Sequence, residues 1–318
     1  MSYALLGECG YNQCMNLKGG GRMYGLLALL TGLILSVMVS VNGILSESYG
    51  VFRASVIIHV VGILFAFLLC AVRKENRKLT GHAPAWIYLG GAIGAFTTVF
   101  NNLAFGHISM TSIVALGLLG QALMSLVIDC LGLFGMKRCP FCRYNLVGLA
   151  FSLTGIFVML DATVGKAAYA VLLSLAAGVT VVLSRTVNAR LSGKVGALSG
   201  SLVNHMAGLP VTAVICMLVG ESMKPVSGSG PAAHPWIYTG GMMGVIVVML
   251  CNLTVPRLPA FRLTMLTFVG QIFTGILLDV AAGKGRVDAS FAGGLMIAAG
   301  IAVNMGLERI DIAGKKLN

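Results

Sequence analysis

The sequence predicts an all-α membrane protein with ten transmembrane helices, arranged as two five-helix repeats of inverted topology. The first observation behind this prediction is composition. Of the 318 residues, 57% are hydrophobic and 10% are charged, and the mean hydropathy is +0.92, whereas roughly a quarter of the residues in a soluble domain are charged. The second observation is an internal duplication, and the third is a switch of loop charge between its two copies. Together they place the chain in a lipid bilayer.

The duplication keeps a constant register through its best-preserved part. Residues 86–129 and 236–279 share a Trp-Ile-Tyr start, a Gly-Gly pair, a Gly-Gln pair and a final Asp, and each matching pair is 150 positions apart. Further upstream the offset is 146, because loops absorb the difference. We therefore expect one repeat over 24–161, a second over 168–307, and no separate aqueous domain.

Each repeat contains five apolar stretches of roughly 16 to 23 residues, about what a helix needs to cross the hydrocarbon core. An unpaired backbone amide costs on the order of several kcal/mol in lipid, so every stretch is expected to be helical. The third stretch of each repeat starts at Trp86 or Trp236, where an aromatic side chain anchors a helix at the membrane interface. In chain order the stretches are 24–45, 54–72, 85–105, 111–133 and 145–160, then 168–184, 199–219, 236–255, 263–281 and 291–307.

The distribution of Lys and Arg predicts the orientation, because short loops rich in these residues stay in the cytoplasm. Five helices per repeat turn the second repeat upside down, and the loop cations switch sides with it. The connection after the first helix carries Arg53 alone, whereas its duplicate carries three cations beginning with Arg185. We expect a protein integral to the cytoplasmic (inner) membrane, with a mobile tail at 1–23 and a second tail at 308–318, both cytoplasmic.

A longer motif supports a family resemblance. It runs from Gly120-Gln121 to Asp129-Cys130-Leu131-Gly132-Leu133-Phe134-Gly135, and a weaker copy runs from Gly270-Gln271 to Asp279. With the two Trp starts and the Gly-rich helices that follow them, the chain resembles the YdcZ-type branch of the drug/metabolite transporter superfamily. The resemblance covers about residues 24–307 and implies a secondary carrier of small molecules in a bacterial cytoplasmic membrane. It implies no particular substrate.

Polar side chains inside the predicted helices are the candidates for a substrate or proton pathway. An ionisable or amide side chain in a membrane helix faces other helices or a wet cavity, where it binds a ligand or joins helices. The candidates are Asp129, Asp279, His59, His205, Gln121, Gln271, Asn42, Asn188, Asn102 and Asn252.

Each candidate has a structural alternative. The aspartates are either carboxylates at the polar interface or groups that bind a proton or cation. His59 and His205 are either satisfied in the helix bundle or belong to gate clusters, in which Asp129 pairs with His205 and Asp279 pairs with His59. The Gln and Asn amides serve a polar substrate or a helix crossing. Gly90, Gly94, Gly240 and Gly244 are expected to be notches for close helix packing.

Other functional classes fit the sequence less well. The formal charge of +12 suggests nucleic acid, but the cations lie in short connections between apolar stretches. No cofactor, metal site or catalytic group is expected, since the stretches contain no cluster of acids or metal ligands. Zinc or a redox pair at Cys9, Cys14, Cys139 and Cys142 is weighed against free thiols, which we expect.

The sequence therefore predicts a secondary active transporter, with export the favoured direction, for a small polar or cationic metabolite or drug. The partners are the bilayer, a small-molecule substrate and, as a candidate, protons. The alternative is a non-transporting membrane scaffold or regulatory subunit.

Overall fold

A computed structural model shows that the chain is all-helical. It describes residues 21–73, 84–104, 107–108, 110–139, 143–160, 164–220, 235–281, 291–300, 302–303 and 306–307. The first half contains α2 (Gly21–Tyr49), α3 (Val51–Val72), α4 (Gly90–Ala104), α5 (Met110–Leu131) and α6 (Arg143–Met159). The second half contains α7 (Ala168–Val195), α8 (Ala197–Val219), α9 (Thr239–Thr254), α10 (Ala260–Ala281) and an apolar helix at Phe291–Gly300.

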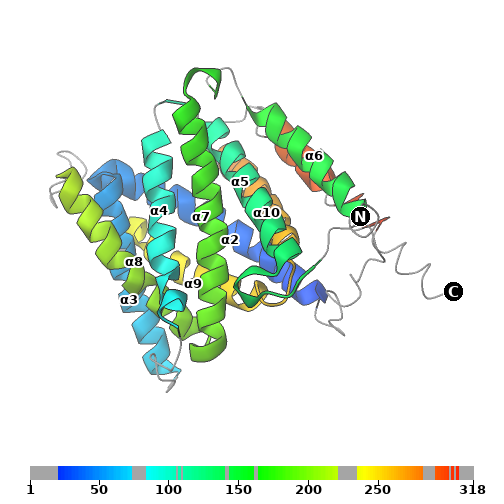
Figure 1. Ribbon diagram of the computed structural model, residues 1–318. Coiled ribbons are helices and arrows are strands. Elements are labelled where there is room, and N and C mark those ends of the chain that lie inside the picture. Colours follow the sequence, from blue (N-terminus) through cyan, green and yellow to red (C-terminus); the bar gives the residue numbers. More distant parts are fainter. Residues whose placement is uncertain are drawn as a thin grey trace.

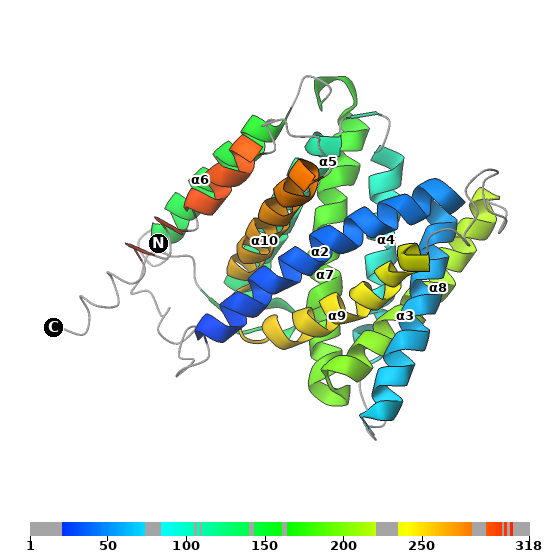
Figure 2. The same cartoon turned by 180° about the vertical axis from the view of Figure 1, so that it is seen from behind.

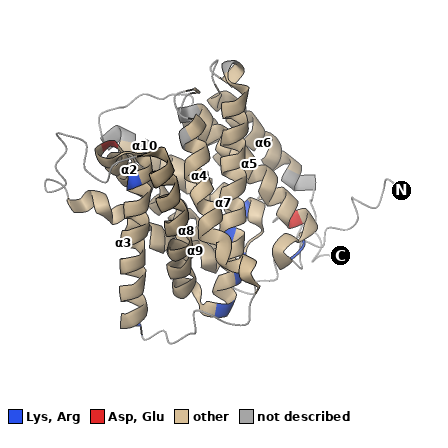
Figure 3. Ribbon diagram, turned by 60° about the vertical axis from the view of Figure 1, so that its left-hand side comes forward, with Lys and Arg blue, Asp and Glu red and all other residues tan. Residues whose placement is uncertain are grey.

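Short 3-10 helices, Ala85–Leu89 and Pro235–Tyr238, lead into α4 and α9 at duplicate positions. Six of the described helical segments are long and apolar enough to cross a membrane, and Leu146–Met159 and Phe291–Gly300 are shorter apolar helices. Figure 3 shows how few charged residues the described helices carry. The helices therefore present apolar surfaces of the kind that a bilayer requires.

One predicted boundary is wrong. We expected the helix at 168–184 to end before Arg185, but α7 continues to Val195 and encloses that residue. Cations usually lie in the connections between membrane helices. Arg185, however, is only 8% exposed and donates hydrogen bonds to oxygen atoms of α5 and α10. A cation that has partners inside a bundle does not end a membrane helix.

The two halves pack across each other. Figure 1 shows α4 and α5 of the first half beside α7 of the second, and the reverse view in Figure 2 shows α9 and α10 beside α2. Helices α3 and α8 pack together at one edge, and α6 lies beside the helix at Phe291–Gly300 at the other. Each contact between the halves thus recurs with the halves exchanged.

Close helix crossings show the same exchange. A Cβ atom on Gly120 would overlap the carbonyl oxygen of Leu175, and one on Gly270 would overlap that of Leu29. Gly270 lies 150 residues after Gly120, and Leu175 lies 146 residues after Leu29. Two main chains can approach this closely only where no side chain separates them, so glycine is required at both positions.

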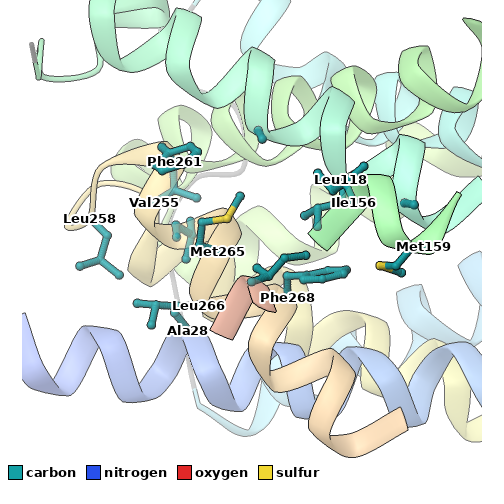
Figure 4. Close-up of a cluster of buried hydrophobic side chains, with 14 of the residues drawn as sticks. Ala28, Leu118, Ile156, Met159, Val255, Leu258, Phe261, Met265, Leu266 and Phe268 are labelled. Carbon is teal, nitrogen blue, oxygen red and sulfur yellow. The ribbon is translucent and has the colours of Figure 1, made fainter. Parts of the chain in front are cut away.

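A hydrophobic cluster joins the remaining helices. Leu118 of α5, Ile156 of α6 and Phe268 of α10 face one another in Figure 4, and Ile297 belongs to the same buried cluster. This packing attaches α6 and the last helix to the α5–α10 pair.

Candidate functional site

Two histidines meet where α3 crosses α8. The ring centroids of His59 and His205 are 5.7 Å apart, with 58° between the ring planes. Space for each ring comes from a glycine on the other helix, because a Cβ on Gly62 would overlap His205 and one on Gly208 would overlap His59. The sequence gives each histidine the same setting, since His59 and His205 are duplicate positions.

The two rings have the same proton arrangement. Nδ1 of His59 lies 2.8 Å from the carbonyl oxygen of Ser55, and Nδ1 of His205 lies 2.9 Å from that of Ser201. A carbonyl oxygen only accepts, so each Nδ1 donates its hydrogen and each Nε2 keeps a lone pair. Neither Nε2 has a hydrogen-bond partner among the described residues. The pair can therefore accept a proton or a donor group.

Asp129 lies near the C-terminus of α5. A carboxylate at this position is disfavoured by the dipole of its own helix. Here its two oxygens accept hydrogen bonds from the backbone N–H groups of Ala260 and Phe261, at 2.7 and 2.8 Å. These groups begin α10, where a negative charge is stabilised by the dipole and by the free N–H groups. Asp129 therefore joins the end of α5 to the start of α10.

The structure brings together a different pair from the one expected at the gates. Asp129 bonds to α10 and His205 lies beside His59, so the Asp129–His205 pair is not formed in this conformation. The side chain of Asp279 lies outside the described residues, as does that of Asn102.

Asn188 and Asn42 lie at duplicate positions but differ in their partners. Nδ2 of Asn188 donates to Oδ1 of Asn204 at 2.6 Å. The residue that corresponds to Asn204 in the first half is Ile58, and Oδ1 of Asn42 is buried without a hydrogen-bond partner. The same position thus supports a polar contact in one half and an unsatisfied acceptor in the other.

The side chains of Asn188 and Asn42 each pack against a glycine of another helix. A Cβ on Gly90 would overlap the Asn188 amide, and one on Gly240 would overlap the Asn42 amide. One turn further on, a Cβ on Gly94 would lie 3.0 Å from Oγ of Ser184, and one on Gly244 would lie 3.3 Å from Nε2 of His205. All four glycines thus face polar side chains of other helices, as well as providing room for close packing.

Gln121 and Gln271 lie on α5 and α10, next to the glycine crossings. Both side chains are half-buried, and neither makes a hydrogen bond with another described residue. An amide offers both a donor and an acceptor. The two glutamines therefore keep their hydrogen-bonding capacity for a ligand or for water.

The end of α9 is hydrogen-bonded to the helices of its own repeat, and we call this set of contacts a fastening. Nδ2 of Asn252 donates to the carbonyl oxygen of Ala197 at 3.0 Å, and Oγ of Ser201 donates to that of Val245 at 3.0 Å. Oγ of Ser192 donates to the carbonyl oxygen of Asn252 at 3.4 Å. These contacts hold α9 against the junction of α7 and α8.

The first half does not repeat this packing among its described residues. Between the described residues of α4 and those of α2 or α3 there is no helix packing comparable to that of α9 on α7 and α8. Ser55, the duplicate of Ser201, is buried, but its hydroxyl makes no hydrogen bond with a described residue. The halves therefore share one architecture but differ in how closely the described residues of α4 and α9 pack on their own repeat.

Sequence reasoning missed Arg185 as a site residue. Its Nη2 donates to Oγ of Ser125 at 3.1 Å, to the carbonyl oxygen of Ala260 at 3.3 Å and to Oγ1 of Thr264. The spacing held a signal, since Arg185 is three residues before Asn188 and so lies on a neighbouring part of the same helix surface.

The expectation of free thiols needs one correction. Cys139 is disulfide-bonded, and its partner lies outside the described residues, as do Cys9, Cys14 and Cys142. Cys70, Cys130, Cys216 and Cys251 are free.

These features define an all-helical membrane protein, built from two repeats that cross around a buried polar interior. The family described as "Putative inner membrane exporter, YdcZ" matches the chain twice, at residues 23–158 and 169–303. The chain belongs to this family and is an integral inner membrane protein, which confirms the resemblance inferred from the sequence.

A solved structure has a similar fold. It is described only as "Crystal structure of protein", and it shares 18% sequence identity and a TM-score of 0.66 with this chain. The similarity covers 90% of this chain and 96% of that one. Among curated proteins, no match was found.

Proposed function

We propose that the protein is a secondary active transporter that exports a small polar molecule by alternating access between two inverted five-helix repeats, 24–161 and 168–307. Both termini are cytoplasmic in this proposal. The observation that carries it is the unequal packing of two duplicated halves, in which α9 packs on α7 and α8 while the described residues of α4 do not pack comparably on α2 and α3.

The inverted arrangement has support from helix packing. Each helix pair between the repeats recurs with the repeats exchanged, as a two-fold relation requires. If each of five helices crosses the bilayer once, the second repeat starts on the opposite side, and the two-fold axis lies in the membrane plane. Duplicate positions then face opposite sides of the membrane.

In the proposed orientation the fastened end of α9 is cytoplasmic and the unfastened end of α4 is external. This conformation would be closed toward the cytoplasm and open toward the outside. The opposite state arises if the Asn252 and Ser201 contacts break and the corresponding contacts at Asn102 and Ser55 form. Because the repeats share one sequence pattern, the two states have similar packing, which alternating access requires.

Polar groups without partners provide the pathway. Gln121, Gln271 and the Nε2 atoms of His59 and His205 have no hydrogen-bond partner among the described residues. Protons are a candidate coupling ion, because each neutral imidazole keeps a lone pair on Nε2 that can accept a proton. A second proton would place two like charges side by side, so the histidine pair favours one proton at a time.

Spin-label distances test this proposal. We would attach one label pair at Leu103→Cys and Val51→Cys, and its duplicate at Leu253→Cys and Ala197→Cys, in a chain whose native cysteines are replaced by serine. Reconstituted protein is compared at about pH 6 and about pH 8, on either side of the usual histidine pKa. We expect one distance to lengthen as the other shortens, with saturable flux of a small polar probe in the same vesicles.

A scaffold gives a different result. Its two distances stay fixed at both pH values and no probe crosses the vesicle membrane. That combination, or two distances that always change together, would exclude alternating access.

A further inference from the structure

We infer that Arg185 forms a binding site for a carboxylate or phosphate group of the transported molecule. This inference rests on the proposed function, because it names the chemical class of the cargo.

Arg185 is buried among α5, α7 and α10, at the level where α5 ends and α10 begins. The side chain is 8% exposed, so it is more than nine-tenths buried but not sealed. A cation buried in a membrane protein is costly and generally marks a pathway for ligands or ions.

The hydrogen-bond acceptors of the guanidinium group are all uncharged oxygen atoms. Only Nη2 makes hydrogen bonds, and its partners are the hydroxyls of Ser125 and Thr264 and the carbonyl oxygen of Ala260. Nε and Nη1 have no hydrogen-bond partner in the part of the chain that the structure describes. The Nε–H and Nη1–H groups are therefore available to an acceptor, whereas Nη2 is already used.

Asp129 does not neutralise this charge directly. Its two oxygens accept hydrogen bonds from the backbone N–H groups of Ala260 and Phe261, and it forms no ion pair with Arg185. The helix N-terminus carries about half a positive charge, which Asp129 offsets. Asp129 attracts Arg185 electrostatically but does not contact it, so no counterion among the described residues is bound directly to the guanidinium group.

A purely structural role does not account for a charged residue here. A neutral amide could donate to the same three oxygens without the penalty of burying a cation. The duplicate position in the first repeat is Val39, which is 56% exposed, so the fold does not require a polar group there. A guanidinium with free N–H groups is well suited to donate charge-assisted hydrogen bonds to a carboxylate or phosphate.

The same geometry argues against a cationic cargo. A buried cation repels it, and the oxygens of Asp129 already have backbone partners. The hydroxyls of Ser125 and Thr264 bond to each other, and Thr264 donates to the carbonyl oxygen of Ala260, so both groups hold the guanidinium in place.

Ligand-induced thermal stabilisation tests the site. The full chain, in phosphatidylcholine nanodiscs at constant ionic strength, is heated with acetate, succinate or inorganic phosphate, and with glucose or tetraethylammonium for comparison. We expect at least one anion to raise the unfolding temperature saturably, while glucose and tetraethylammonium do not. If no anion does so, or if tetraethylammonium does, the inference is overturned.

Variants locate the effect. R185Q should weaken apparent anion affinity by about ten- to a hundredfold, the loss expected for charge-assisted hydrogen bonds. R185K keeps the charge but not the guanidinium group and should fall between R185Q and wild type. R190Q removes a cation from an exposed position on the same helix and should bind anions like wild type. If R185Q unfolds at a lower temperature but keeps its anion response, Arg185 is structural and the inference fails.

Two further arms separate the remaining possibilities. Phosphatidylglycerol nanodiscs supply the same phosphate chemistry as a lipid, and Arg185-dependent stabilisation by this lipid without a response to soluble anions would overturn the cargo assignment. Saturable flux of glucose or tetraethylammonium without anion binding would overturn the site but leave the transporter intact. Anion binding without any flux would retain the site and defeat the proposed function.

Discussion

The ends of α4 and α9 occupy duplicate positions, yet among the described residues only α9 is fastened within its own repeat. Asn252 and Ser201 each donate to a carbonyl oxygen across the α7–α8–α9 contact at 3.0 Å. In the first repeat, Ser55 keeps its position but makes no such bond, and α4 does not pack comparably on α2 or α3 among the described residues.

The glycine crossings differ from these polar contacts in being present on both sides. Gly120 meets the main chain of Leu175, and Gly270 meets that of Leu29 in the same way. The molecule thus has two kinds of helix contact. Both repeats form the glycine crossings, whereas in the proposed mechanism only one repeat at a time forms the polar contacts at the end of its third helix. We therefore expect substitutions at a formed fastening to have larger effects than the same substitutions at its duplicate.

The largest expected effect is at Asp129. Asp129→Ala removes two charge-assisted hydrogen bonds and leaves two backbone N–H groups at the start of α10 without acceptors. The expected loss is about 3 to 5 kcal/mol in the free energy of unfolding. Denaturant unfolding of the purified protein in detergent measures it, and Asp129→Asn should lose less because one acceptor remains.

Asp279→Ala is the matched control at the duplicate position. We expect a smaller loss. In the proposed orientation Asp129 lies at the closed, cytoplasmic end of the bundle, whereas Asp279 lies toward the open, external end. Equal losses would show that both aspartates fasten helices at once, which contradicts an alternating arrangement.

The second effect is on the balance between states. Asn252→Ala removes the hydrogen bond to Ala197, worth about 1 kcal/mol, which shifts the population of the two states about fivefold. The label pair at Leu253→Cys and Ala197→Cys should report a larger open fraction. Asn102→Ala should leave that distance unchanged, and an equal response to both variants would remove the distinction between the two ends.

The sequence predicted the features that depend on pattern. Apolar length located α2, α3 and α8, because backbone hydrogen bonding in lipid leaves few alternatives to a helix. The duplication identified His59 and His205 as equivalent residues, and the structure places them side by side. Conserved spacing carries this information without any knowledge of tertiary contacts.

Pairing between distant helices could not be predicted in the same way. The acceptor role of Asp129 depends on the start of α10, which is 131 residues away. Arg185 was assigned to a loop because hydropathy counts its charge but does not show the oxygens of Ser125 and Thr264 beside it. Such partners are set by packing, and neither residue's local sequence contains them.

The smallest effect distinguishes Asn188 from Asn42. Asn188→Ala removes a hydrogen bond to Asn204 and leaves the Asn204 oxygen without that donor, so about 1 kcal/mol of stability should be lost. Asn42→Ala removes an amide whose Oδ1 is already buried without a partner, so it should cost less than half as much in the same unfolding experiment. A larger cost at Asn42 would mean that its oxygen receives a donor in the membrane, from water or from the cargo. The first repeat would then contribute to the polar pathway in the conformation described here, and the difference between the repeats would be limited to the ends of α4 and α9.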